Sequence, residues 1–473
     1  MTTSPTRASS EPQMTPRAWG LLLVVCGALF LEGSDIAMLN VAVPAIADDV
    51  GLSAGSAHWV ISAYVLGYAG FMLLGGRSAD LLGRRRVFLA SLAVFVVFSA
   101  LGGFADADWV LVLARFATGV AAGFMTPAGF SIVTTTFPEG PLRDRALVVY
   151  GAVGAAGFVL GMVAGGLLTT ASWRWVFYAP ALLGVVLLAA GARLIRPDEP
   201  RTAAAGGFDV AGSIAVTTGM VAVVYAVIEL GESRDLGDTW LPLAVAALLL
   251  VAFVVIERRS RFPLLRLGLL REELLPHASL AGLLFMGAFF AFQFAVTLYL
   301  QELRGWSPLE AGLTFAIMGL DLLLAPLVTP PLVRRFGIVA VLTTGLVAAA
   351  LAFGRLLALG DDWGYLDLLP SLLLVAVSFA LVYGPLTSAA AEGIAETEQG
   401  AAGGVVYTAF QFGGALGLAV VTIVLAGDGT SAVALDDYRR ALWVPTVAAV
   451  LAVLVGLAAA HRRRRAEVAV RLP

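Results

Sequence analysis

The sequence has one cysteine, three histidines and no lysine, and these absences exclude several kinds of site. A single thiol, Cys26, cannot form a disulfide within one chain. All 30 basic residues are arginine, which excludes a Schiff-base lysine and the lysine of a Walker-type phosphate loop. Direct coupling to ATP hydrolysis is therefore not expected. The histidines, His58, His277 and His461, do not cluster, so we expect no metal site.

Charged residues are also scarce. They make up 13% of the chain, against 59% hydrophobic residues, whereas an average soluble domain carries about 25%. Apolar runs of about 20 residues, the length that crosses a hydrocarbon core of about 30 Å, recur from Trp19 to Ala460. The composition excludes a soluble globular domain and predicts an all-α integral membrane protein.

We predict fourteen membrane spans with both termini on one side. The first run carries Glu32 and Asp35 and lacks a small-residue cleavage site, so we interpret it as a retained helix and not as a signal peptide. The predicted spans are residues 19–43, 57–76, 87–105, 109–133, 146–169, 174–195, 209–230, 240–257, 278–301, 309–333, 337–359, 366–388, 402–426 and 441–460.

The distribution of arginine predicts the orientation of these spans. Most arginines fall on the side of the N-terminus, including residues 84–86, 334–335 and 462–465, whereas the opposite loops carry acids such as Asp48 and Asp361. Cytoplasmic loops are enriched in basic residues. We therefore expect both termini in the cytoplasm, although the cytoplasmic segment 392–398 has no arginine.

Two similar loops indicate an internal repeat. Residues 331–337, PLVRRFG, resemble a decayed copy of residues 76–86, GRSADLLGRRR, and each follows the second span of its half. Repeated six-helix halves produce such a pattern. The predicted regions are a disordered leader 1–18, an N-terminal bundle 19–196, a linker region 197–271 with two extra spans, a C-terminal bundle 272–460 and a basic tail 461–473.

The loop at residues 76–86 resembles the cytoplasmic signature of the major facilitator superfamily. Five further motifs are similar, in the expected order, to those of the fourteen-span drug:proton antiporters in that superfamily: residues 35–44, 115–119, 157–166, 173–177 and 307–312. The resemblance implies two six-helix bundles with two inserted helices. It also implies transport driven by a proton gradient, with no cofactor and no enzymatic activity.

Four positions depart from the usual motifs. Ala37 replaces a threonine, Leu81 a basic residue, Thr118 a glutamine and Met162 a proline. The change at Met162 weakens the inference of exchange, because the Gly-Pro pair is thought to bend the helix between the halves. Small residues spaced by four, Gly157, Gly161 and Gly165, still permit close helix contact.

Two acids in the first span are candidates for proton coupling. An ionised acid in hydrocarbon costs at least about 2.5 kcal/mol, so acids retained there usually face a polar cavity. Glu32 and Asp35 are three residues apart and share a helix face. Since two neighbouring carboxylates do not ionise together readily, we expect one to hold a proton near neutral pH. The alternative is an acid satisfied by a structural arginine.

Arg115 is the basic residue predicted to lie deepest in a span. It lies about 9 Å below the surface on the fourth span, and Asp35 lies about 12 Å below the same surface on the first. The family places these helices side by side, which implies that Arg115 stabilises the deprotonated acid. A purely structural bond to backbone carbonyls of the first span is the alternative.

Asp321 lies in the middle of the tenth span and is predicted to favour cationic substrates or to hold a second proton. The alternative is a buried carboxyl group that is hydrogen-bonded to the backbone or to a hydroxyl. Polar and aromatic residues on several spans form a candidate substrate wall, with lipid contact or helix packing as the alternative. They are Tyr64, Tyr68, Phe289, Gln293, Tyr407 and Gln411.

The loop at residues 76–86 is the candidate cytoplasmic gate. We expect Asp80 to pair with arginine or with a helix N-terminus in one state, Gly76 and Gly83 to permit a tight turn, and Arg84 and Arg85 to bind headgroups. A signal for topology alone is the alternative interpretation.

The sequence as a whole predicts a proton-coupled exporter of lipophilic, often cationic, compounds. The alternatives are an exporter or uptake symporter of one metabolite and, in another class, a membrane enzyme or sensor. We expect a monomer in a bacterial plasma membrane, with the lipid bilayer and a small molecule as partners and no nucleic acid. Basic residues that are all arginine suggest a GC-rich genome.

Overall fold

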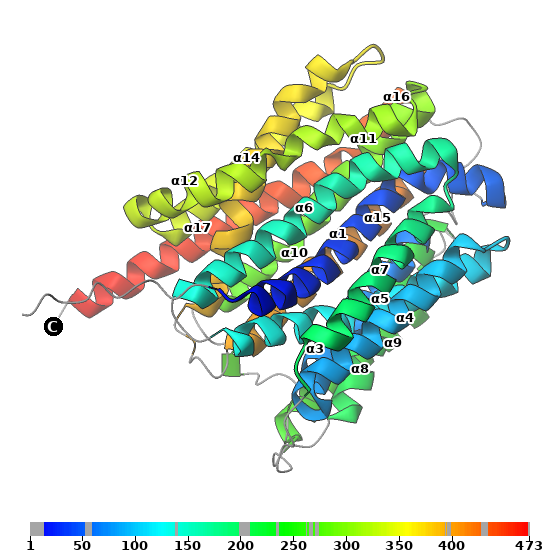
Figure 1. The fold of residues 1–473 in the computed structure, drawn as a ribbon. Helices are drawn as coiled ribbons and strands as arrows, with labels where there is room; N and C mark the ends of the chain where they lie inside the picture. Colours follow the sequence, from blue (N-terminus) through cyan, green and yellow to red (C-terminus); the bar gives the residue numbers. More distant parts are fainter. Residues whose placement is uncertain are drawn as a thin grey trace, which may run out of the picture.

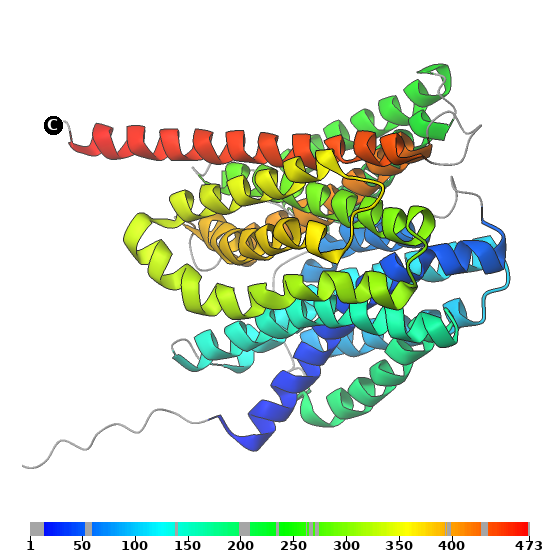
Figure 2. The same cartoon turned by 90° about the horizontal axis from the view of Figure 1, so that it is seen from above.

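The computed structural model describes residues 14–52, 59–137, 141–197, 209–232, 236–261, 263, 268–269, 274–392, 394, 399–426 and 434–471. Within these residues the chain is helical and contains no strand. Thirteen described segments, each a single helix or a run of consecutive helices, are long and apolar enough to cross a membrane, and α8 (Val210–Glu232) adds the shorter apolar stretch Ala211–Val223. The elongated helices run side by side along one main direction (Figures 1 and 2). The predicted all-α membrane fold is confirmed.

Six helices form the N-terminal bundle. Within it α3 packs against α5, α1 against α6, and α4 against both α5 and α7. The helices are α1 (Pro16–Val50), α3 (Trp59–Leu82), α4 (Arg84–Gly103), α5 (Asp108–Thr136), α6 (Pro141–Ala171) and α7 (Trp175–Leu194).

The C-terminal bundle repeats this arrangement with more interruptions. Its main contacts join α10 to α15 and α17, and α13 to α14 and α17. The elements are α10 (Leu275–Leu298), the π-helix η2 (Tyr299–Leu303), α11 (Pro308–Ala316), the 3-10 helix η3 (Ile317–Leu320), α12 (Asp321–Phe336), α13 (Ile338–Arg355), the 3-10 helix η4 (Leu356–Ala358), α14 (Tyr365–Ala391), α15 (Gln399–Ala426), α16 (Leu435–Ala441) and α17 (Trp443–Arg471).

The inserted helices α8 and α9 (Leu236–Arg259) pack against each other. Helix α8 also contacts α3 of the first bundle and α15 of the second, and the Thr217 hydroxyl donates a hydrogen bond to the Gly70 carbonyl on α3. Leu241, Leu248 and Val251 on α9 are exposed, which suits a helix that faces lipid. The inserted pair therefore lies at the seam between the two bundles.

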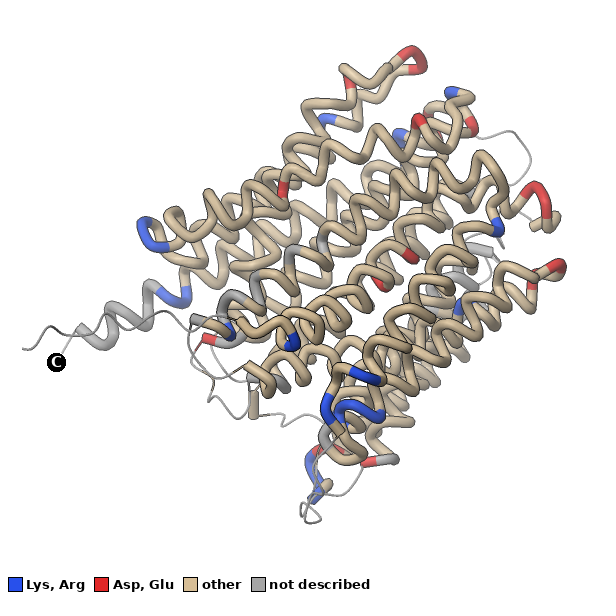
Figure 3. The backbone as a smooth tube through the Cα atoms, viewed as in Figure 1, with Lys and Arg blue, Asp and Glu red and all other residues tan. Residues whose placement is uncertain are grey.

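The two ends of the bundle differ in charge (Figure 3). One end, which we call the arginine-rich end, contains the starts of α1 and α4 and the arginines at 84–86, 334–335 and 462–463. The opposite end, which we call the acidic end, contains the loops with Asp106, Asp361 and Asp362. The two ends of the bundle therefore separate the arginine-rich loops from the acidic loops, as the sequence predicted.

Two details of the predicted elements were wrong. The turn at residues 76–86 was placed too early, because α3 continues through Gly76 to Leu82 and Gly83 alone, at φ 102°, makes the break. Only glycine adopts that backbone conformation readily. The tenth span is not one regular helix, because η3 interrupts it between α11 and α12.

On the side of α1 and α6, the bundles approach each other most closely toward the acidic end. There α6 lies against α11: a Cβ on Gly166 would stand 2.8 Å from Leu309 Cα. Gln301 on η2 donates a 3.0 Å hydrogen bond to the Val41 carbonyl on α1. Toward the arginine-rich end α6 has few contacts with α12. On the side of α6, the bundle interface is therefore tighter at the acidic end.

Candidate functional site

A buried ion pair joins α1 to α5. Arg115 Nη1 donates to Asp35 Oδ2 at 2.6 Å, and the two side chains are 1% and 0% exposed. The predicted match in depth between these residues is thus realised as direct contact. In the part of the chain that the structure describes, Asp35 Oδ1 and Arg115 Nη2 have no hydrogen-bond partner. Each member of the pair therefore retains capacity for another hydrogen bond.

Arg115 also binds the neighbouring helix α3. Its Nε donates to the Val60 carbonyl at 2.9 Å, and its guanidinium lies 4.4 Å from the centre of the Tyr64 ring. Such a cation–π contact is worth about 2 kcal/mol when it is desolvated. Arg115 therefore makes both of the bonds that were predicted as alternatives, one to the Asp35 carboxylate and one to a backbone carbonyl. The carbonyl, however, belongs to α3 and not to the first span.

Glu32 has a different environment from Asp35. Thr126 on α5 donates a hydrogen bond to Glu32 Oε2, and Tyr68 on α3 donates a 3.1 Å hydrogen bond to the Thr126 hydroxyl. Glu32 is 6% exposed. The two acids of α1 therefore meet different partners on α5: Asp35 meets a cation, and Glu32 meets a hydroxyl.

The spacing of residues on α5 explains this arrangement. Arg115 and Thr126 are about three helical turns apart and lie on one face of α5, which crosses α1. Glycines allow α3 to approach the same helix, because a Cβ on Gly123 would stand 2.9 Å from the Tyr68 carbonyl oxygen. Sequence reasoning missed Thr126, although its position three turns beyond Arg115 is a usable signal.

Asp321 begins α12, directly after η3, and is partly buried. Its Oδ1 is buried without a hydrogen-bond partner among the described residues. Neighbouring Gly319 approaches Val159 of α6, at the contact between the bundles. The break at η3 therefore places a carboxylate at mid-span, close to the boundary between the bundles.

The predicted aromatic wall divides into two groups. Phe289 is 4% exposed and lies between the bundles, with ring centres 5.4 Å from Phe158 on α6 and 4.6 Å from Phe379 on α14. Tyr407 and Gln411 on α15 are partly buried. Tyr64 and Tyr68 belong to the Arg115 and Glu32 networks described above.

Gln293 on α10 bridges the bundles through a methionine. Its Nε2 lies 3.1 Å from Met162 Sδ on α6, and both side chains are fully buried. A Cβ on Gly312 of α11 would overlap the Met162 carbonyl. Met162, which stands where the family usually has proline, is therefore packed against α10 and α11 of the opposite bundle.

The α6 glycines do form a close helix interface, but their partner is α1. A Cβ on Gly157, Gly161 or Gly165 would stand 2.6 Å from an α1 backbone atom. Gly166 instead approaches Pro308 and Leu309 of α11, so the contact between bundles uses the neighbouring face of α6. The Asp80 side chain lies outside the described residues, so its gating role stays a prediction.

At the acidic end, the motif at residues 173–177 closes the N-terminal bundle. Arg174 binds Asp49 at 2.8 Å and Asp106 at 2.9 Å, and Trp173 Nε1 donates to Asp49 at 2.8 Å. The hydrogen bond to Asp49 contributes most to raising the pKa of Arg174 above its usual value. This cluster ties the ends of α1, α4 and α7 together.

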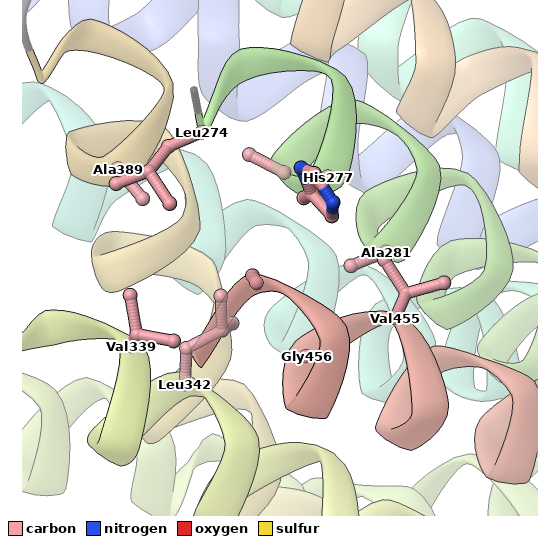
Figure 4. Close-up of a pocket in the computed structure, with 10 residues that line it drawn as sticks. Leu274, His277, Ala281, Val339, Leu342, Ala389, Val455 and Gly456 are labelled. Carbon is pink, nitrogen blue, oxygen red and sulfur yellow. The ribbon is translucent and has the colours of Figure 1, made fainter. Parts of the chain in front are cut away.

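A small pocket lies inside the C-terminal bundle, between α10, α13, α14 and α17 (Figure 4). Its lining is apolar apart from His277, and includes Leu342, Ala389 and Gly456. Since all of its walls belong to one bundle, the pocket is separate from the Asp35 and Glu32 networks.

Comparison with known proteins identifies the family. Residues 25–418 match the model of the Major Facilitator Superfamily. The chain is 37% identical to puromycin resistance protein pur8 of Streptomyces alboniger, over 89% of this chain and 86% of that protein. It is 35% identical to cephamycin export protein CmcT of Amycolatopsis lactamdurans, over 88% and 87% of the two chains.

Solved structures agree on the fold. The POT family transporter PepTSo superposes with a TM-score of 0.68 at 17% identity, covering 95% of this chain and 99% of that one. The nucleoside transporter NupG gives a TM-score of 0.63 at 14% identity, with coverage of 93% and 99%. From its sequence match and its two bundles, the chain belongs to the major facilitator superfamily.

Proposed function

We propose that the chain is a proton-coupled antiporter that exports lipophilic, mainly cationic, compounds across a bacterial plasma membrane. The observation that carries the proposal is the buried contact of Asp35 with Arg115 next to buried Glu32, in a chain similar to named resistance and export proteins. Acids kept within membrane spans are typical of proton relays.

Proton exchange at Asp35 would change the strength of the α1–α5 contact. The ionised carboxylate pairs with Arg115, and protonation removes the charge that holds this pair together. Arg115 keeps its bond to Val60 on α3 in either case. Protonation of one carboxylate thereby changes how tightly α1 packs against α3 and α5. This change in packing biases the rocking of the two bundles.

For substrate recognition, we propose that Asp321 supplies an anion on the second bundle and that Phe289, Gln293, Tyr407 and Gln411 supply contact surface. The unpartnered Asp321 oxygen and the position of Phe289 between the bundles support these roles. Apolar contact is non-directional, which suits ligands of varied shape.

Everted membrane vesicles test the proposed direction and energy source. With an inward-acidic gradient, vesicles containing the protein should accumulate a lipophilic cationic dye several-fold over vesicles without it, and an uncoupler should release the dye. Accumulation that persists with the uncoupler would contradict proton coupling. Counterflow with single metabolites distinguishes the alternative, a dedicated exporter or symporter.

The orientation of the chain is a second testable proposal. Since basic residues are enriched in cytoplasmic loops, we propose that the arginine-rich end faces the cytoplasm. Reporter fusions after Arg201 and after Arg462 should both give cytoplasmic signals. A periplasmic signal at either position would refute this topology, and a fusion after Asp362 at the acidic end is the matched control.

A further inference from the structure

Helix α8 lies beside α3 (Figure 1) and is attached to it by a hydrogen bond. The Thr217 hydroxyl donates to the Gly70 carbonyl, whereas Thr343 donates to a carbonyl of its own helix. A Cβ on Gly70 would stand 3.1 Å from Thr217 Cγ2. Since glycine has no side chain, Thr217 can reach the backbone of α3. This contact fixes the position of α8 along α3.

Helix α3 is in turn packed closely inside the N-terminal bundle. A Cβ on Gly67 or Gly75 would overlap a backbone carbonyl oxygen of α5, whereas Gly70 faces α8. Two backbones in direct contact cannot shift past each other without separating, so α3 keeps its place on α5. Helix α8 is therefore attached, through α3, to the N-terminal bundle.

Helix α8 also packs against α15 of the C-terminal bundle. Ala215 and Val216 of α8 belong to the same apolar core as Val406 and Phe410 of α15. Apolar contact is non-directional, so it lets one helix shift along another. The inserted helix thus combines a hydrogen bond to one bundle with apolar packing against the other.

The direct contact between α3 and α15 lies next to this hydrogen bond. A Cβ on Gly404 of α15 would stand 3.6 Å from Leu73 Cδ2 on α3. Leu73 is three residues beyond Gly70, so the two positions are neighbours on the surface of α3. Helix α8 therefore lies alongside the seam at which α3 and α15 meet.

We propose that the inserted pair is a sliding cover: α8 moves with the N-terminal bundle, slides along α15 and keeps lipid out of the α3–α15 seam. Rocking of the bundles separates α3 from α15. The Asp35–Arg115 pair, which is bonded to α3 through the Val60 carbonyl, would then approach hydrocarbon. Polar groups are costly in lipid, so a cover that follows one bundle preserves the barrier. The proposal rests on rocking transport and assigns a role to α8 and α9.

A disulfide between positions 70 and 217 tests whether α8 moves with α3. Thr217 Cβ lies 3.9 Å from a Cβ built on Gly70, and disulfides join Cβ atoms about 3.5 to 4.5 Å apart. In a Cys26→Ala background, Gly70→Cys with Thr217→Cys should form the bond on oxidation. Dye efflux should stay within about twofold of that of the reduced protein, because the two helices keep their spacing. A larger loss that a reductant reverses would refute the attachment.

The matched control ties α3 to α15 in the same background. Leu73→Cys with Gly404→Cys, joined by a short bis-thiosulfonate linker, should lower efflux about tenfold or more, because the seam can no longer open. A reductant should restore efflux. Full efflux with this link in place would overturn the proposal, since a seam that stays closed needs no cover.

Oxygen dissolved in the bilayer tests the cover without transport. A nitroxide at Leu73 should collide with oxygen less often than one at Leu248, which is exposed on α9. Gly70→Leu pushes α8 from α3 and should raise collisions at Leu73 about twofold or more, whereas Gly151→Leu should not. Equal collision rates at Leu73 and Leu248 in the parent protein would refute the cover, even if Gly70→Leu does not fold. A parent protein that exports nothing but shields Leu73 refutes the efflux function alone.

Discussion

Replacing Asp35 by Asn should abolish both gradient-driven efflux and drug-induced proton release from the purified protein. The substitution preserves size and removes the group that we propose carries the proton. It also leaves Arg115, which is 1% exposed, without its anionic partner. Removing one member of a buried pair typically costs about 3 to 5 kcal/mol, so the amount of folded protein must be measured alongside transport.

The matched control for this experiment is Glu32→Gln on the same helix. Glu32 contacts a hydroxyl and not the guanidinium, so its loss should leave part of proton release and part of efflux. Both variants are measured by the pH change of a weakly buffered solution on drug addition, and by dye efflux from energised cells. Full proton coupling in Asp35→Asn would transfer the carrier role to Glu32 or Asp321.

Sequence reasoning located the Asp35–Arg115 pair because both residues obey simple geometric rules. Their depths follow from the rise of a helix and from the ends of apolar runs, and the resemblance supplied the adjacency of the helices. The same rules do not show which way a side chain turns once a helix is packed. For this reason the contact of Arg115 with Val60 was not predicted.

The missed features depend on contacts between distant segments. Gln301 and Val41 belong to different bundles, and no periodicity within η2 or α1 connects them. The interruption at η3 likewise occurs inside an apolar run that has no breaking residue between Ile317 and Leu320 other than Gly319. Apolar composition reports membrane insertion well, whereas local helix geometry is decided by tertiary packing.

Replacing Gly119 by Leu should prevent accumulation of folded protein. A Cβ at this position would overlap the Tyr64 carbonyl, and its next contact is Tyr64 Cα at 2.9 Å. Backbone cannot rotate away as a side-chain tip does, so α3 must move from α5 and withdraw the Tyr64 ring from Arg115. Overpacking of this kind costs about 3 kcal/mol or more.

Gly151→Leu is the matched control for this substitution. Gly151 is also in a helix, is exposed, and has nothing within 4 Å of its Cβ position. Fluorescence-detected size exclusion of a tagged protein should therefore show a monodisperse peak at the wild-type level for Gly151→Leu, and a reduced or aggregated peak for Gly119→Leu. Equal peaks and equal melting temperatures for the two variants would contradict this prediction. They would mean that α3 and α5 can move apart at Gly119 without loss of folded protein, and that the position of Tyr64 does not depend on their close approach.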